Sequence, residues 1–204
     1  MESLPTPDIH HLDAAQGWLD LQNLTDATHE LEKIRPAFRV HPDVLEVRWQ
    51  IYAKTGWWIA ALEMAVAICE LAPERFAGWI QYSESLHALG HTKQARDLLL
   101  KALEKFPNIT AIFYGLSRYS CLLGQSDEAW QWLERALNHE GGEALMRRAL
   151  EETDFTSLWE KLRTLQAARP LLPPVPTQCD APTTLEQKRS FSRSFGREGR
   201  WRAC

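Results

Sequence analysis

The chain lacks any long uninterrupted run of hydrophobic residues. Its richest apolar stretch, residues 57–69, is interrupted by Glu63 and is shorter than the roughly 20 residues that span a bilayer. The first residues, MESLPTPDIHHLD, do not form the basic-then-apolar pattern of an export signal. We therefore expect a soluble, cytoplasmic protein without a membrane partner.

The chain also lacks the spacings that build disulfide frameworks, metal sites and common catalytic sites. Its four cysteines show no paired spacing, which disfavours disulfides and structural zinc: Cys69, Cys121, Cys179 and Cys204. None of the ten glycines forms a phosphate-binding GxGxxG or GxxxxGK pattern. We therefore expect no enzyme activity, no cofactor and no metal.

The net charge of −4 is divided unevenly along the chain. Residues 1–170 carry 17 Lys and Arg against 24 Asp and Glu, a net charge of −7, whereas residues 171–204 have a net charge of +3. This last segment opens with LLPPVPT and has few apolar residues, so burial cannot offset its ordering entropy. We predict a disordered tail, proline-rich and then basic, at residues 169–204. The acidic body disfavours nucleic acid as its partner.

Residues 8–143 carry an internal repeat at a constant interval. A column of alanines marks it: Ala27, Ala61, Ala95 and Ala129. A column of glycines with the same spacing lies five positions ahead of the last three alanines: Gly56, Gly90 and Gly124. The period is about 34 residues, and a fixed period of roughly 20–50 residues indicates a stacked-repeat architecture.

Each unit is predicted to be a pair of helices, because apolar residues recur at spacings of three and four on both sides of the turn glycine. In the third unit, the first stripe contains Trp79, Tyr82 and Leu86, and the second contains Leu99 and Ala102. The glycine between them ends the first helix in the left-handed conformation, which is least costly for glycine. The repeated alanine lies where the two helices cross, and a larger side chain would separate their axes.

This pattern resembles the tetratricopeptide repeat family. Eight residues of the third unit follow that family's pattern position by position: Trp79, Ser83, Leu86, Gly90, Ala95, Leu99, Ala102 and Pro107. The resemblance implies an all-α fold, a right-handed α-solenoid of about four helix-turn-helix units at residues 8–41, 42–75, 76–109 and 110–143. Two units depart from the pattern. Gln22 replaces the turn glycine of the first unit, and Arg48 and Trp49 replace an aliphatic and a small residue in the second.

Two further amphipathic stretches follow the fourth unit. Gly141 and Gly142 break the chain, and residues 143–150 and 155–165 then show apolar faces. A solenoid needs a terminal element with a polar outer face, because an uncapped last repeat leaves its stacking surface in water. We therefore assign residues 144–168 as a C-terminal helical cap.

In proteins similar to this one, the first helix of each unit lines a concave groove. Projection of that face gives seven candidate partner-binding residues: Gln50, Gln81, Glu84, His87, Tyr114, Arg118 and Cys121. Asp13, Asp20 and Glu46 make the N-terminal end of the same face acidic. Tyr114 and Arg118 belong to the residue types that dominate interfaces, so we expect their truncation to weaken binding and to leave the fold unchanged. His87 would add a pH dependence between about 6 and 7.

These features favour a non-catalytic scaffold that binds a peptide or helix of another protein in the concave groove. Some tetratricopeptide proteins hold the C-terminal carboxylates of a peptide with a Lys/Asn/Arg clamp, and that set is absent at the matching positions here. Two alternatives stay open. One is an RNA-binding helical-repeat protein, because a related family of helix pairs reads single strands, and the other is a regulatory subunit of an associated enzyme. The identity of the partner and the oligomeric state do not follow from the sequence.

Overall fold

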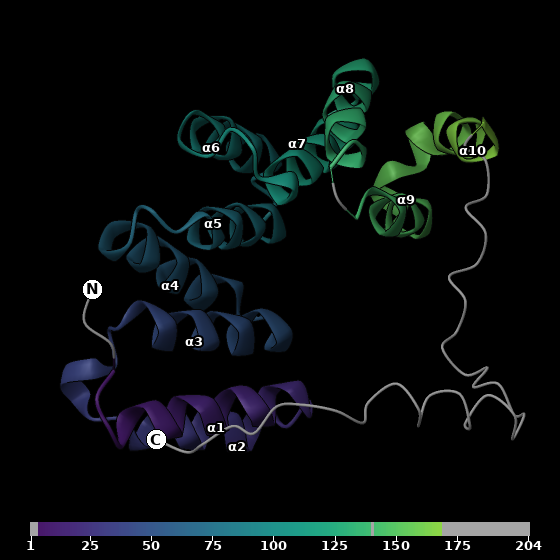
Figure 1. The fold of residues 1–204 in the computed structure, drawn as a ribbon. Helices are drawn as coiled ribbons and strands as arrows, with labels where there is room; N and C mark the ends of the chain where they lie inside the picture. Colours follow the sequence, from purple (N-terminus) through teal and green to yellow (C-terminus); the bar gives the residue numbers. More distant parts are fainter. Residues whose placement is uncertain (1–3, 140, 169–204) are drawn as a thin grey trace, which may run out of the picture. The chain divides into compact units, whose positions relative to one another are not determined.

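A computed structural model describes residues 4–139 and 141–168 of the chain. These residues form ten α-helices and two short 3-10 helices, with no strand among them, so the expected all-α class is confirmed. Figure 1 labels the α-helices, and the elements in chain order are α1 (Asp8–Asp20), α2 (Leu24–Lys33), η1 (Pro36–Phe38), α3 (Pro42–Thr55), α4 (Trp58–Leu71), α5 (Phe76–Ala88), α6 (Thr92–Lys105), α7 (Thr110–Leu122), α8 (Ser126–Leu137), α9 (Gly142–Glu151), η2 (Thr153–Leu158) and α10 (Trp159–Ala168). The expected tail at 169–204 lies outside the described residues.

Consecutive helices pack as pairs, α1 with α2, α3 with α4, α5 with α6 and α7 with α8. Each of the four predicted units contains one such pair. Neighbouring units contact one another through their first helices, α1 with α3, α3 with α5 and α5 with α7, and through α4 with α5 and α6 with α7. Contacts limited to neighbouring pairs are typical of a helical-repeat solenoid.

Each alanine of the repeated column lies on the second helix of its pair. All four members are fully buried, as the steric argument requires: Ala27, Ala61, Ala95 and Ala129. The period in the sequence therefore corresponds to a period of burial in the structure.

The turns inside the units share one backbone conformation. Gly56, Gly90 and Gly124 have φ angles of 77°, 86° and 77°. Gln22 occupies the same place in the first unit with a φ of 60°, and its side-chain oxygen accepts a hydrogen bond from Lys54 at 3.2 Å. The first unit therefore keeps the left-handed turn without glycine, at a cost of about 1 kcal/mol.

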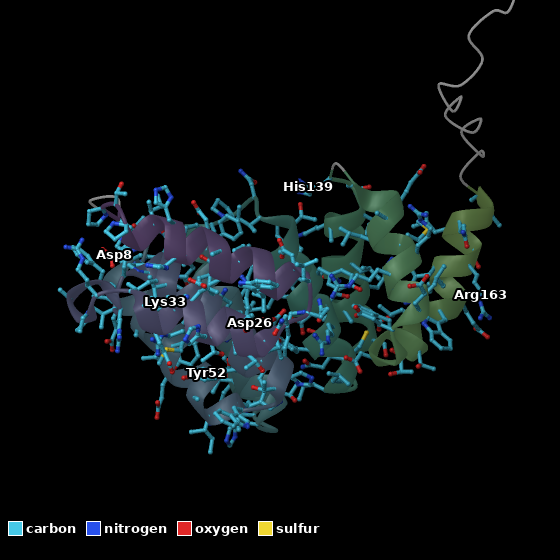
Figure 2. The ribbon with its side chains drawn as sticks, turned by 90° about the horizontal axis from the view of Figure 1, so that it is seen from below. Asp8, Asp26, Lys33, Tyr52, His139 and Arg163 are labelled. Carbon is cyan, nitrogen blue, oxygen red and sulfur yellow. The ribbon has the colours of Figure 1, made fainter. Side chains whose placement is uncertain are left out.

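The first unit ends differently from the others. Its second helix α2 is only 10 residues long and is followed by the 3-10 turn η1. The buried carboxylate of Asp8, labelled in Figure 2, accepts hydrogen bonds from the backbone N–H and the Nε of Arg35, both at 2.8 Å. These hydrogen bonds lower the pKa of Asp8. The ion pair joins the start of α1 to the segment that follows α2.

The bulky residue of the second unit is accommodated by a hydrogen bond. Trp49 is buried, and its indole Nε1 donates to the hydroxyl of Ser85 on α5 at 2.9 Å. Ser85 in turn donates to the carbonyl of Gln81 at 2.9 Å. The small hydroxyl side chain on α5 leaves room for the indole, so the departure at Trp49 joins the second unit to the third.

The segment after α8 extends the hydrophobic core. Met146 of α9, Phe155 and Leu158 of η2 and Leu162 of α10 are buried in one cluster with Leu133 of α8. Helix α9 is shorter than the first helices of the earlier units, and η2 then packs against α7. This contact places residues 152–157 beside the face of α7 that carries the predicted binding residues.

Candidate functional site

The seven predicted residues lie on the first helices of three successive pairs. Helix α3 carries Gln50, α5 carries Gln81, Glu84 and His87, and α7 carries Tyr114, Arg118 and Cys121. Two cavities lie along these helices. One includes Gln50, and the other brings Glu84, Tyr114 and Arg118 together.

The first cavity, of about 220 Å³, lies between α1 and α3 and is called the α1–α3 cavity here. Its lining comprises Leu12, Asp13, Gln16, Asp43, Glu46, Val47 and Gln50. Arg75 forms an ion pair with Asp43. Burial raises the pKa of Glu46, and the charge of Asp43 adds to this effect while Arg75 opposes it. The cavity therefore holds a carboxylate that burial disfavours and that no side chain within the described residues pairs.

The second cavity, of about 110 Å³, lies where α5, α6, α7 and α9 meet and is called the central cavity. Its lining comprises Ile80, Ser83, Glu84, Leu99, Ala111, Tyr114, Gly115, Arg118, Tyr119, Leu145 and Arg148. Burial raises the pKa of Glu84, although Arg118 and Arg148 oppose the effect. Both arginines form ion pairs with other carboxylates, so neither neutralises Glu84 directly.

Tyr114 contacts the C-terminal segment of the chain. Its side chain is only 6% exposed, and its hydroxyl donates a hydrogen bond to Glu152 at 3.0 Å. Its ring lies 5.1 Å from the ring of Phe155 and 5.2 Å from the guanidinium of Arg148. Burial and the neighbouring carboxylate of Glu152 raise the pKa of the phenol. Because the ring is buried, we expect truncation of Tyr114 to lower the free energy of unfolding in addition to any effect on partner binding.

Arg118 and Cys121 contact the same segment. The Nε of Arg118 donates to Asp154 at 2.7 Å. Burial raises the pKa of the Cys121 thiol, while a hydrogen bond with Ser157 opposes the rise. The raised pKa keeps Cys121 protonated at neutral pH, which disfavours a role as a nucleophile. Partner binding by these residues stays a prediction, and the structure gives all of them contacts within the chain.

Gln81 and His87 line neither cavity. Gln81 is 7% exposed, and its side-chain oxygen has no hydrogen-bond partner among the described residues. His87 Nδ1 lies 3.0 Å from the hydroxyl of Thr92, and its ring lies 5.2 Å from that of Tyr119. Burial lowers the pKa of His87, and the charge of Arg118 lowers it further, while Asp154 opposes both. Any pH dependence due to His87 is therefore expected below its ordinary value of about 6.5.

The described residues include neither a metal-binding group of side chains nor a helix that could cross a membrane. Residues 4–139 and 141–168 contain no group of three or more His, Cys, Asp or Glu side chains arranged to hold a metal ion. The helices in these ranges are also too short or too polar to cross a membrane.

Solved structures share this arrangement of helices. A thermophilic TPR protein from Thermus thermophilus superposes with a TM-score of 0.59 at 19% identity, over 77% of this chain and 99% of that one. A crystal structure of MamA protein superposes with a TM-score of 0.59 at 13% identity, over 78% and 88% of the two chains. The chain has a tetratricopeptide-repeat-like fold. A second MamA structure gives a TM-score of 0.59 at 16% identity, over 69% of this chain and 82% of that one.

These likenesses establish the fold alone. No family model matches the chain, and no curated protein matches it either. The function must therefore be argued from the side chains on the first helices of the pairs.

The sequence did not predict the residues that contact Tyr114 and Arg118 at the α7 end of the predicted binding face. Arg148, Glu152 and Asp154 contact Tyr114 and Arg118 from a part of the chain beyond the last repeat. The acidic run at residues 151–154, directly after a predicted helix, was the signal that could have suggested partners for Arg118.

Proposed function

We propose that the chain is a non-catalytic interaction module that holds a segment of another protein against the face shared by α1, α3 and α5. The observation that carries the proposal is a pair of half-buried carboxylates, Glu46 in the α1–α3 cavity and Glu84 on the α5 wall of the central cavity. Neither forms an ion pair within the described residues, and burial raises the pKa of both. A buried carboxylate without a counter-ion is costly, and a lysine or arginine of a partner would supply one.

The balance of donors and acceptors on this face favours a partner that donates hydrogen bonds. The buried side-chain oxygen of Gln81 lacks a donor within the described residues, and Asp13 is exposed at the edge of the α1–α3 cavity. The cations nearby already have partners, since Lys54 bonds Gln22 and Arg75 pairs with Asp43. A peptide or helix with basic side chains and free N–H groups would match this surplus of acceptors.

The predicted binding residues divide into two groups within this proposal. Gln50, Gln81, Glu84 and His87 are proposed to contact the partner. Tyr114, Arg118 and Cys121 are proposed to shape the end of the face through their contacts with residues 152–157. The helical-repeat fold supports the proposal because such folds present rows of side chains from successive first helices to a bound segment.

A photo-crosslinking amino acid at position 50 tests the proposal directly. We expect cross-links to a protein partner from Gln50 in native lysate, and few from Glu63, an exposed residue of the second helix α4. The partner's cross-linked peptide should contain lysine or arginine, and Glu46→Gln together with Glu84→Gln should reduce the yield. Equal yields from positions 50 and 63, or a yield that ignores both substitutions, would contradict the proposal.

Nuclease treatment separates the alternative of RNA binding. Unpaired carboxylates such as Glu46 and Glu84 repel phosphates, so we expect the cross-links at position 50 to survive nuclease. Loss of the cross-link after nuclease would favour the RNA-binding alternative. Identification of a catalytic chain as the cross-linked protein would instead favour a regulatory subunit.

A further inference from the structure

A third cavity lies between α2 and α3, on the side of α3 away from the proposed binding face. It has a volume of about 80 Å³, and its lining comprises Thr28, Leu31, Glu32, Arg48, Ile51 and Tyr52. Each helix contributes residues at spacings of three and four, so one face of each helix forms a wall. Arg48 and Gln50 are two positions apart and therefore point about 200° away from one another around α3.

Arg48 has no partner in the described part of the chain. Its Nε is buried without a hydrogen bond, and it forms no ion pair with a described residue. The other half-buried arginines in this part all hold a carboxylate or a carbonyl group: Arg39, Arg75, Arg96 and Arg118. An unpaired buried donor is rare because it loses its hydration without compensation.

The repeat shows how unusual a cation is at this place. Tyr82 and Leu116 occupy the equivalent positions of the third and fourth units. Leu116 is fully buried in the core, and Tyr82 packs on the cluster that contains Ala61 and Ala65. Packing alone therefore favours an apolar residue where Arg48 lies, and breaks of this kind without a compensating contact are typical of functional sites.

An exposed aromatic surface adjoins the cavity. Trp57 is 66% exposed and stacks on Tyr52, with ring centroids 6.1 Å apart and planes inclined by 21°. Tyr52, which is labelled in Figure 2, also lines the cavity, so one phenol ring links the exposed indole to the wall that carries Arg48. The surface thus combines a cation that lacks an anion among the described residues with an aromatic side chain that lacks cover.

We propose that this cavity binds an acidic side chain of a partner protein, with an adjacent aromatic residue of the same segment on Trp57. The carboxylate would accept hydrogen bonds from the guanidinium of Arg48, a charge-assisted pairing that suits arginine. A free inorganic anion would gain nothing from Trp57 and would face the nearby carboxylate of Glu32. A protein segment gains apolar contact that offsets this repulsion.

Substitution of Glu32 gives a variant that should bind an acidic side chain more tightly. Its exposed carboxylate lines the same cavity and is not within ion-pair distance of Arg48. Because it repels an incoming carboxylate, Glu32→Gln should strengthen binding. Arg48→Met keeps most of the length of the side chain and removes its charge, so it should abolish binding without opening a large void.

Nuclear magnetic resonance can follow the site in the full chain. The probe is the blocked dipeptide N-acetyl-Asp-Phe-amide, and its matched control is N-acetyl-Asn-Phe-amide. Two signals report on the site, the Nε–H of Arg48 and the indole N–H of Trp57. The variants Arg48→Lys and Trp57→Phe assign them. Both signals should shift as the aspartyl probe is added, and the shifts should reach saturation. We expect the asparaginyl control to bind about tenfold more weakly, Arg48→Met not to bind, and Glu32→Gln to bind more tightly.

Three results would overturn the proposal. The first is equal binding of the aspartyl and asparaginyl dipeptides. The second is unchanged binding to Arg48→Met, and the third is a shift of Arg48 by inorganic phosphate as large as that by the dipeptide, without a shift of Trp57. The last result would mark a site for free anions only. Because the probes do not involve Glu46 or Glu84, failure here is distinguishable from failure of the proposed binding face.

Discussion

The contacts of Tyr114 give the sharpest test of how the C-terminal segment meets the repeats. Tyr114→Phe removes the hydroxyl that donates to Glu152 at 3.0 Å. A hydrogen bond to a charged group contributes about 1.5–3 kcal/mol to stability. Glu152 keeps its ion pair with Arg148 at 2.6 Å, so its carboxylate remains satisfied in the variant. We therefore expect Tyr114→Phe to lower the free energy of unfolding by about 1.5 kcal/mol, the lower end of that range.

Tyr114→Ala also removes the buried ring and its contact with Phe155. Loss of a buried aromatic side chain costs about 3–5 kcal/mol, because the cavity left behind adds to the lost transfer free energy. Urea denaturation followed by circular dichroism measures both free energies of unfolding from the midpoint and the slope. A double-mutant cycle with Glu152→Gln should give a coupling energy of about 1 kcal/mol.

Tyr82→Phe is the matched control, since the hydroxyl of the half-buried Tyr82 makes no hydrogen bond with a described residue. We expect this control to lie within about 0.5 kcal/mol of the unmodified chain. The reasoning fails if Tyr114→Phe matches Tyr82→Phe, or if Tyr114→Ala costs less than about 1 kcal/mol. Either result would mean that residues 152–155 do not pack on α7 in solution.

Three further predictions concern the turns, the close approaches and the buried acid. Gln22→Gly relieves a positive φ of 60° and should raise the free energy of unfolding by about 1 kcal/mol in urea denaturation; an unchanged midpoint would count against the left-handed turn. Gly115→Ala places a methyl 2.7 Å from a methyl of Leu99 and should cost about 1–3 kcal/mol, whereas Gly17→Ala meets no atom within 4 Å and should stabilise its helix by about 0.5–1 kcal/mol. Burial raises the pKa of Glu84, so its ionisation weakens the fold as pH rises through the range between its ordinary and its raised pKa. Glu84→Gln should therefore raise the thermal midpoint at pH 7 but not at pH 4, and an equal effect at both values would refute this assignment.

The repeated part of the fold was predictable because each sequence column has a local steric cause. Ala95 and its three equivalents are fully buried, and the glycines take the left-handed turn that their spacing indicates. An unbroken period transfers such information from one unit to the next. Gln22, which replaces the turn glycine of the first unit, also takes the left-handed conformation, because the two helices that it joins require that turn.

The candidate site was less predictable because its features depend on contacts that the period does not encode. Projection of α7 identified Tyr114 and Arg118 as face residues, but the period stops at residue 143, so nothing gave the register of Glu152 or Asp154. The burial of Glu46 depends on the neighbouring helix α1, and that of Glu84 depends on α6, α7 and α9. A helical projection gives the direction of a side chain and leaves open what covers it.

Helix α3 carries two charged groups that form no ion pair with a described residue, one on each side of the helix. On one side, Glu46 lacks a cation, and on the other, Arg48 lacks an anion. The two residues are two positions apart and point in nearly opposite directions, so no side-chain movement within α3 can pair them. A helix that only needed stability would carry an apolar residue where Arg48 lies, as Leu116 does in the fourth unit. The basic segment of the proposed function and the acidic segment of the further inference would therefore lie on opposite sides of the same helix.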